Sequence, residues 1–274
     1  MTSLGADEGE DLEDGSRSVT PDGDNLRLDY ARAEAAAYGE LVRSSGGRVD
    51  DTTLPAVHLR DLGVGTPFGN LALLSTPVTG GEAANTIAEI RDWFGRGEGG
   101  PFLIFSPWRT DDWRDHGLNP VGHPPLMLRP PGAGPVPAQG VTVERVADGE
   151  VLAQWERTFL HAYPVPEMLP AVRGSFVGPE VLGGSWTFFL GRVEGHPAAT
   201  SAAYVTPTLN VVELVSVLPD HRGRQLGTAL SLAAATVAPD RPSMLIASDL
   251  GRGVYARLGY LPLLRYTLWL GERP

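Results

Sequence analysis

A proline- and glycine-rich segment near the middle of the chain limits the fold more than any other feature of the sequence. Residues 129–138 contain four prolines and two glycines. Such a stretch cannot continue a helix or a central strand, because proline fixes φ and lacks the backbone N–H donor. We therefore expect an extended linker. The predicted division of the 274 residues is an acidic tail at 1–24, a first domain at 25–128, the linker at 129–138 and a second domain at 139–274.

Acidic residues are concentrated at the N-terminus. Residues 1–24 carry eight acids and one arginine, which accounts for −7 of the net charge of −11. We expect this tail to be disordered, because it has few apolar groups to offset the entropy of ordering. It is either a solubilising leader or an interaction arm. The acidic balance predicts no nucleic-acid partner, since phosphate binding needs a basic face.

Other absences narrow the class of protein further. The chain has no cysteine, which excludes disulfides, thiolate metal sites and a cysteine nucleophile. It has no apolar run of about 18 residues and no basic-then-apolar leader, so we expect a cytoplasmic protein that does not enter the membrane. His116 and His123 are seven residues apart with no third ligand in an obvious place, and we predict no metal site.

Hydrophobic periodicity predicts an α/β (α+β) fold, with a mixed, mostly antiparallel sheet flanked by helices and a smaller α/β domain at the N-terminus. In the first half we expect helices at 25–43 and 82–94 and strands at 70–74, 102–105 and 126–128. In the second half we expect helices at 149–160, 227–237 and 253–258, and strands at 141–146, 186–193, 199–205, 211–217, 243–247 and 263–270. The three consecutive strands predict an antiparallel meander, and the strand–helix–strand that follows predicts a parallel crossover.

The loop after the strand at 211–217 carries the clearest chemical signal. It runs Val-Leu-Pro-Asp-His-Arg-Gly-Arg-Gln-Leu-Gly-Thr-Ala from Val217 and leads into an Ala/Leu-rich helix. Backbone N–H groups of a loop and a helix N-terminus favour anions. Gly223 and Gly227 allow close approach, and Arg222 and Arg224 supply charged donors for phosphate oxygens. The pattern predicts a pyrophosphate site, and it is neither a P-loop nor a G-x-G-x-x-G loop.

This loop resembles the coenzyme A loop of the GNAT family of N-acyltransferases, which reads Arg/Gln-x-x-Gly-x-Gly/Ala. Arg222 takes the first position and Gly227 the last, while Gln225 stands where the family has its first glycine. The segment around Tyr255, Gly259 and Tyr260 resembles the family's Tyr-x-x-x-Gly-Phe helix end. The resemblance covers residues 138–274. The first half resembles the reduced N-terminal half of tandem GNAT proteins, and no such loop occurs in it.

The resemblance implies an acetyl-CoA-dependent N-acetyltransferase. The backbone around Val215 and Val217 would hold the thioester and the pantetheine arm. The pyrophosphate would lie on the amides of the segment that comprises Arg222, Gly223, Arg224, Gln225, Leu226, Gly227 and Thr228. Tyr255 would protonate the departing thiolate, since a phenol with a pKa of about 10 stays protonated at neutral pH.

The remaining site residues are assigned from their position in the chain. Glu213 is the candidate base, because alternation along the strand places it on the same face as Val215 and Val217; alternatively it is an exposed strand carboxylate. Ser248 is expected to cap a helix or contact the cofactor. Tyr163 and Glu167 lie in a Pro-rich turn and are expected to bind a cationic amine, or the turn is only a connector.

The predicted reaction is therefore acetyl transfer to the primary amine of a small molecule. Two other functions stay open: acetylation of protein Nα or lysine groups, and non-catalytic sensing of acyl-CoA, which the glutamine at position 225 suggests. The oligomeric state, a homodimer included, is also open.

Overall fold

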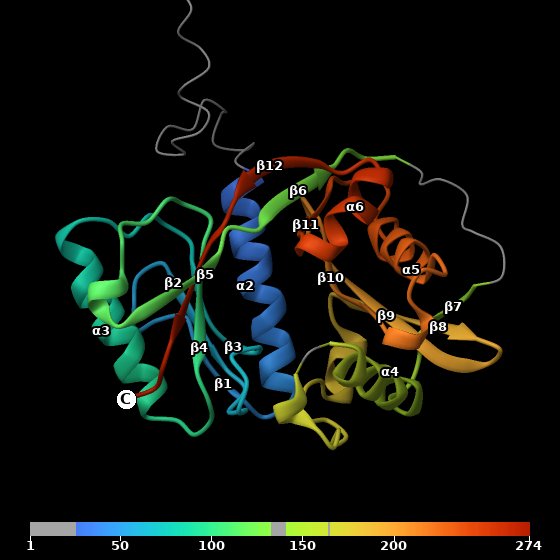
Figure 1. The fold of residues 1–274 in the computed structure, drawn as a ribbon, viewed down its shortest axis with the longest axis horizontal. Coiled ribbons are helices and arrows are strands. Elements are labelled where there is room, and N and C mark those ends of the chain that lie inside the picture. The colour runs from blue at the N-terminus through green and yellow to red at the C-terminus, as the bar shows by residue number, and fades with distance from the viewer. Residues whose placement is uncertain (1–25, 133–140, 164) are drawn as a thin grey trace, which may run out of the picture.

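The computed structural model describes residues 26–132, 141–163 and 165–274, which form two β-sheets with helices on their faces (Figure 1). The predicted tail, and the predicted linker from residue 133 on, lie outside the described residues. Within the described ranges, no helix is long and apolar enough to cross a bilayer. The mixed architecture with mostly antiparallel sheets confirms the predicted fold class.

The first sheet has six strands in the order β1-β2-β3-β4-β13-β5. Its strands are β1 (Arg48–Asp50), β2 (Val57–Asp61), β3 (Asn70–Leu74), β4 (Phe102–Ser106), β5 (Leu118–Gly122) and β13 (Thr267–Gly271). Helix α3 (Gly81–Gly95) covers one face with Ile87, Ile90 and Phe94, and a short 3-10 helix, η1 (Arg114–His116), lies beside it. The other face packs against α2 (Leu26–Ser44).

The second sheet has seven strands in the order β12-β6-β11-β10-β9-β8-β7. Its strands are β6 (Pro125–Arg129), β7 (Thr142–Arg145), β8 (Trp186–Val193), β9 (His196–Val205), β10 (Asn210–Val217), β11 (Ser243–Ile246) and β12 (Leu261–Arg265). Strands β8, β9 and β10 form the predicted antiparallel meander, and β10 pairs in parallel with β11 across a helix, as predicted.

Helices lie on both faces of this second sheet. Helix α4 (Gly149–Ala162) packs on one face, while α5 (Leu226–Ala235) and α6 (Asp249–Arg257) pack on the other. Helix α2 also packs against the α4 face, through Tyr30, Ala33, Ala37 and Leu41. It therefore lies between the two sheets and contacts both of them (Figure 1).

The two halves exchange strands. Strand β6 belongs to the first half in sequence, yet it pairs with β11 and β12 in the second sheet. Strand β13 ends the second half, yet it pairs with β4 and β5 in the first sheet. The boundary at residues 129–138 thus separates the chain in sequence but does not separate the two sheets in space.

Several expected elements need correction. The single strand expected at 263–270 is two strands in different sheets, because the chain crosses from one sheet to the other at Tyr266. Helix α6 begins at Asp249, four residues before the expected start, because Ser248 caps it. Strands β1, β2 and β5 were not expected. Strand β2 is buried but carries Arg60 and Asp61, so only Val57 and Leu59 mark it as apolar in the sequence.

Candidate active site

The second sheet opens between β10 and β11. The two strands pair only at Asn210 with Ser243 and at Val211 with Met244, although β10 continues to Val217. On its other side β10 stays paired with β9 down to Val217. Within the described residues, the edge of β10 beyond Val211 therefore has no ladder partner on the β11 side. An extended chain could add to this edge as a further strand does.

A β-bulge gives β10 its shape in this region. The register against β9 shifts between Glu213 and Ser216, and Leu214 adopts a left-handed φ of 57°. The hydroxyl of Thr200 on β9 stabilises the bulge: it donates to the Leu214 carbonyl at 3.0 Å and lies 2.7 Å from the Ser216 hydroxyl. A bulge inserts one unpaired residue and so reverses the alternation of side chains beyond it.

This reversal overturns one expectation. Glu213 points to the face that carries α2, together with Leu214. Val215 and Val217 instead pack against the opposite face, the one that carries α5. The prediction that all three side chains share a face was wrong, because it assumed an unbroken strand. The bulge thus separates the candidate base from the two residues assigned to the cofactor.

Glu213 is held by two phenols of α2. The Tyr38 hydroxyl donates to Oε2 at 3.1 Å and the Tyr30 hydroxyl to Oε1 at 3.3 Å. Burial raises the pKa of Glu213 from 4.5 to about 7, and the hydrogen bonds from Tyr38 and Tyr30 oppose the rise. A carboxylate with a pKa near neutrality is suited to general-base chemistry. Neither tyrosine was predicted as a site residue.

The predicted pyrophosphate loop follows β10 directly. The 3-10 helix η4 (Pro219–His221) is closed by hydrogen bonds from the amides of His221 and Arg222, and the Arg222 Nε donates to the Val217 carbonyl at 3.3 Å. Gly223 has a φ of +77° and Gln225 a φ of +62°. The side chains of Arg222, Arg224 and Gln225 are exposed.

The left-handed conformation of Gln225 explains why the family pattern has glycine there. A residue with a Cβ adopts this conformation at a cost that glycine avoids. Gln225 nevertheless reaches the geometry that starts α5, and Leu226, buried at 1% exposure, anchors the first turn. The departure from the pattern therefore leaves the turn into α5 in place.

The N-terminus of α5 offers free donors to an anion. In the described part of the chain, no acceptor faces the amides of Leu226, Gly227 and Thr228, as is usual for a first helical turn. A Cβ on Gly227 would meet only the Val217 side chain, at an ordinary 3.7 Å. No protein group therefore fills the space next to Gly227. A phosphate group could occupy this space and approach the amides closely.

Tyr255 lies on α6, in the cluster on the face of the sheet that carries α5, and Val215 of β10 packs against this cluster. Its side chain is 8% exposed, it packs edge to face on Tyr260 with ring centroids 5.8 Å apart, and its ring covers Gly251. Burial raises the pKa of Tyr255 above its usual value of 10, and the charge of Glu213 adds to the rise. The phenol is therefore protonated at neutral pH. Ser248 caps α6 through the Gly251 amide at 3.2 Å, one of its two predicted roles.

The two predicted substrate residues lie apart. Tyr163 ends α4, packs between Phe68 and Phe159 with centroids 4.7 and 5.2 Å away, and interacts electrostatically with Glu213. Glu167 is exposed on the 3-10 helix η2 (Pro166–Met168), beside Gly65. The structure thus places Tyr163 and Glu213 on the face of the sheet that carries α2 and α4, places Tyr255 on the opposite face, and leaves Glu167 at the surface.

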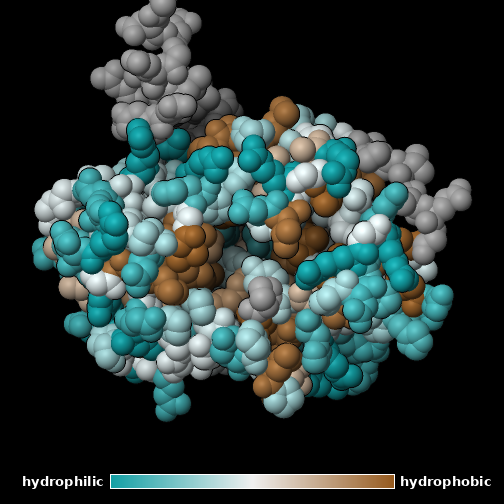
Figure 2. Space-filling model, in the orientation of Figure 1, coloured by the Kyte–Doolittle hydropathy of each residue, from teal (hydrophilic) through white to brown (hydrophobic). Residues whose placement is uncertain are grey.

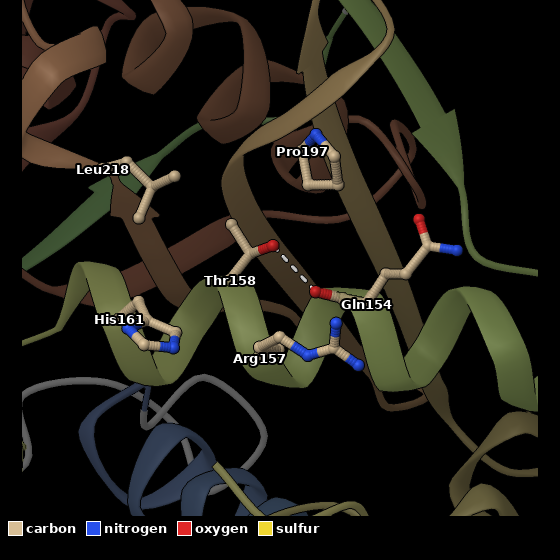
Figure 3. A pocket seen from close by; sticks show the side chains of 6 residues that line it. All are labelled: Gln154, Arg157, Thr158, His161, Pro197 and Leu218. Atoms are coloured by element: carbon tan, nitrogen blue, oxygen red, sulfur yellow. Dashed lines mark hydrogen bonds between the residues drawn. The ribbon is translucent and has the colours of Figure 1, made fainter. Parts of the chain in front are cut away.

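A separate groove runs along α4. It has a volume of about 520 Å³ and contains none of the predicted site residues. Figure 3 shows Gln154, Arg157, Thr158 and His161 of α4 on one side, with Pro197 and Leu218 on the other. Leu218 directly precedes the loop, so the groove reaches the end of β10 from the α4 face. Among the described residues, no group of three potential metal ligands occurs.

Several solved structures are similar to this chain in fold. A GCN5-related N-acetyltransferase from Kribbella flavida is 23% identical over 91% of this chain and 96% of its own, with a TM-score of 0.63. One from Sphaerobacter thermophilus is 16% identical over 90% and 94%, with a TM-score of 0.52. A tandem GNAT protein from the clavulanic acid biosynthesis pathway is 15% identical over 80% and 78%, with a TM-score of 0.50. No protein-family model and no curated protein matches the chain.

The chain therefore has the acyl-CoA N-acyltransferase fold of the GNAT proteins, which is the fold that the resemblance implied.

Proposed function

We propose that this protein transfers an acetyl group from acetyl-CoA to the primary amine of a small molecule, by direct attack within a ternary complex. The observation that carries the proposal is the combination of the unpaired edge of β10 with the free amides at the start of α5, one directly after the other in the chain. The first suits the amide-bearing pantetheine arm and the second suits the pyrophosphate.

When bound, acetyl-CoA would supply the acetyl group as an activated thioester. The amides of Leu226, Gly227 and Thr228 would bind the phosphates, with Arg222 and Arg224 as exposed cations nearby. Val215 and Val217 would flank the pantetheine arm from the α5 side, and the bulge would hold Glu213 on the opposite face.

Two proton transfers then balance the reaction. The ammonium group first loses one proton to solvent. Glu213 then accepts the second proton, which the nitrogen loses as the N–C bond forms, and a pKa of about 7 favours this at neutral pH. Tyr255 donates its phenolic proton to sulfur as the C–S bond breaks. Glu213 belongs to β10, and Val215 of the same strand packs against the cluster that contains Tyr255, which supports the proposal that both groups serve one site.

A first experiment tests the cofactor by itself. A ligand at about 100 times its Kd stabilises a protein by about 2.7 kcal/mol, which corresponds to roughly 5–11 °C for a protein of this size. We expect acetyl-CoA to produce such a shift and ATP and NAD to produce none. A folded protein that does not respond to acetyl-CoA would contradict the assignment of the loop.

Turnover with a panel of amines then separates catalysis from acyl-CoA sensing, and small amines from peptides. All 22 basic residues of the chain are arginines. Acetylation of its own lysines therefore cannot contribute to the measured product. The acidic charge and the need for acetyl-CoA fit a cytoplasmic enzyme that does not bind nucleic acid, and we extend the proposal to these two points.

A further inference from the structure

The geometry points to an acceptor subsite that is built by both halves of the chain and binds a primary monoamine with an apolar body. Tyr38 and Tyr30 of α2 position the Glu213 carboxylate. The Tyr163 ring, near this carboxylate, receives the ammonium group of the amine. This inference rests on the proposed function, since it names the class of amine. It goes beyond the cofactor loop, which belongs to the second half alone.

One face of α2 carries a stripe of polar-tipped side chains. Tyr30, Glu34 and Tyr38 follow one another at intervals of four residues, so they lie on one face of the helix. This face meets β10, where both phenols bind Glu213. The buried side chains of the stripe belong to the first half, and the carboxylate that they hold belongs to the second.

Glu213 and two of the aromatic rings near it are partly exposed. The side chains of Glu213, Tyr163 and Phe68 are only half-buried, whereas Tyr30 and Tyr38 are buried. No acceptor or donor is recorded for the Tyr163 hydroxyl among the residues that the structure describes. Figure 2 shows the surface hollowed at the junction of the two halves, with hydrophobic residues on both sides. A ligand would thus reach a carboxylate and aromatic rings together.

The groups around Glu213 give the subsite an acidic character. The groups that interact with Glu213 are carboxyls and phenols: Tyr30, Glu34, Tyr38, Tyr163, Tyr255 and Tyr266. Glu34 is 2% exposed and lies against Tyr266, and burial raises its pKa well above the usual value of a carboxyl group. Glu213 is then the one anion of this group that is open to a ligand.

These features select one kind of amine. A carboxylate beside aromatic faces favours an organic cation over a neutral molecule of the same shape. A single open anion matches one ammonium group, and the stack of Phe68, Tyr163, Phe159 and Phe176 behind it matches an apolar body rather than a second charge. A phenylalkylamine has this chemistry, and a polyamine does not.

The obvious objection is that the Tyr–Glu contacts merely attach α2 to the sheet. The chain provides a matched control for this, because the Tyr204 hydroxyl on β9 donates to Glu40 of α2 at 2.8 Å. Tyr204→Phe removes the same kind of contact between the same helix and the same sheet without touching Glu213. Tyr38→Phe and Tyr204→Phe should therefore destabilise the protein to a similar degree.

The test measures binding directly, so it does not depend on turnover. Calorimetry with the full chain and CoA would compare 2-phenylethylamine, its neutral analogue 2-phenylethanol, and putrescine. We expect 2-phenylethylamine to bind at least about tenfold more tightly than either of the others, which corresponds to one charged contact. We expect Glu213→Gln to abolish that preference, because it removes the charged contact. Tyr163→Leu should weaken the preference and Tyr204→Phe should keep it.

A second readout addresses positioning. Because the Tyr38 hydrogen bond lowers the pKa of Glu213, Tyr38→Phe should move the acidic limb of kcat/KM upward by roughly half to one pH unit. Tyr204→Phe should leave the limb in place. Equal limbs in the two variants, or equal binding of the amine and the alcohol, would overturn the inference. Amine binding without any response to acetyl-CoA would instead refute the proposed function and leave the subsite standing.

Discussion

Gly227 allows ligand binding to be separated from stability. The substitution Gly227→Ala adds one methyl group at the first turn of α5, next to the amides assigned to the phosphates. The new Cβ would meet only the Val217 side chain at 3.7 Å, an ordinary contact distance. The fold therefore accepts the methyl group, and its other neighbours would be those of a bound ligand.

The two expected effects have opposite signs. Alanine is favoured over glycine in a helix by up to about 1 kcal/mol, and by less in the first turn. The melting temperature of the free protein should thus stay the same or rise by up to roughly 3 °C. A phosphate displaced by the methyl group loses hydrogen bonds to a charged acceptor that contribute about 1.5–3 kcal/mol. The Kd for acetyl-CoA should accordingly increase by roughly 10- to 150-fold.

The assay is calorimetric titration with acetyl-CoA together with thermal unfolding of the free protein. Gly253→Ala serves as the control, because Gly253 is an exposed glycine within α6 whose Cβ would meet only the flexible end of Arg257. It should show the gain in stability without the loss of affinity. If Gly227→Ala binds acetyl-CoA within about twofold of the wild type, the phosphates do not lie over these amides. A melting temperature lowered by several degrees would show that the glycine is required by the fold.

Three further predictions concern the loop and the two catalytic groups. Gln225→Gly should raise the free energy of unfolding by about 0.5–1 kcal/mol. Glycine avoids the cost that a side chain has at a φ of +62°, and this gain exceeds the additional chain entropy that glycine loses on folding. Denaturant titration would measure the change, and a loss of stability would contradict the left-handed conformation of Gln225. Tyr255→Phe should lower kcat while the Kd for acetyl-CoA changes little, since only the hydroxyl is removed from a packed ring; an unchanged kcat would remove Tyr255 from the mechanism. Burial raises the pKa of Glu213 from 4.5 to about 7. The folded protein therefore binds the proton of this carboxyl group more tightly than the unfolded chain does. The stability that results is complete below pH 4.5 and is lost as the pH rises through 7. Between these values, the unfolding free energy of the wild type should fall by up to roughly 3 kcal/mol more than that of Glu213→Gln, and parallel pH profiles would refute the shift.

The sequence predicted those elements whose apolar pattern follows a single period. Helices α2, α3 and α4 and strands β3, β8 and β10 lie within a few residues of their expected bounds, because each helix buries one apolar face and each strand is a largely buried apolar run. The loop after β10 was noticed for a different reason: its glycines and arginines form a motif, and a Cβ at Gly227 would meet only the Val217 side chain at an ordinary distance.

Strand β2 shows why other elements were missed. It is buried, but its charged residues are neutralised by partners outside the strand, which lie 9, 13 and 212 residues away in the sequence. Arg60 donates to the Ala35 carbonyl at 3.0 and 2.7 Å and to Asp51 at 2.7 Å. Asp61 accepts from Arg48 at 2.8 Å and from Arg273 at 2.6 Å. Hydrophobic periodicity cannot identify a strand whose burial depends on ion pairs formed only in the folded chain.

The bulge in β10 was invisible for a related reason. It is stabilised by Thr200 of the neighbouring strand, and nothing in the sequence of β10 itself marks Leu214 for a left-handed conformation. The tyrosines of α2 left a partial signal, since Tyr30, Glu34 and Tyr38 form a stripe of polar-tipped residues on a buried helical face. Such tips require partners, but the partner, Glu213, lies 175 residues further along the chain from Tyr38.

The exchange of strands explains why this distance can be bridged reliably. Strand β6 lies between β11 and β12, so the second sheet is incomplete without a segment of the first half. Strand β13 lies between β4 and β5, so the first sheet is equally incomplete without the end of the chain. Each half therefore anchors the other through backbone hydrogen bonds on both sides of the inserted strand. Helix α2 is thereby fixed against β10, and two hydroxyls can keep hydrogen-bonding distance from one carboxylate across the boundary between the halves. The first half can in this way take part in the proposed acceptor subsite although the proposed cofactor loop lies in the second half.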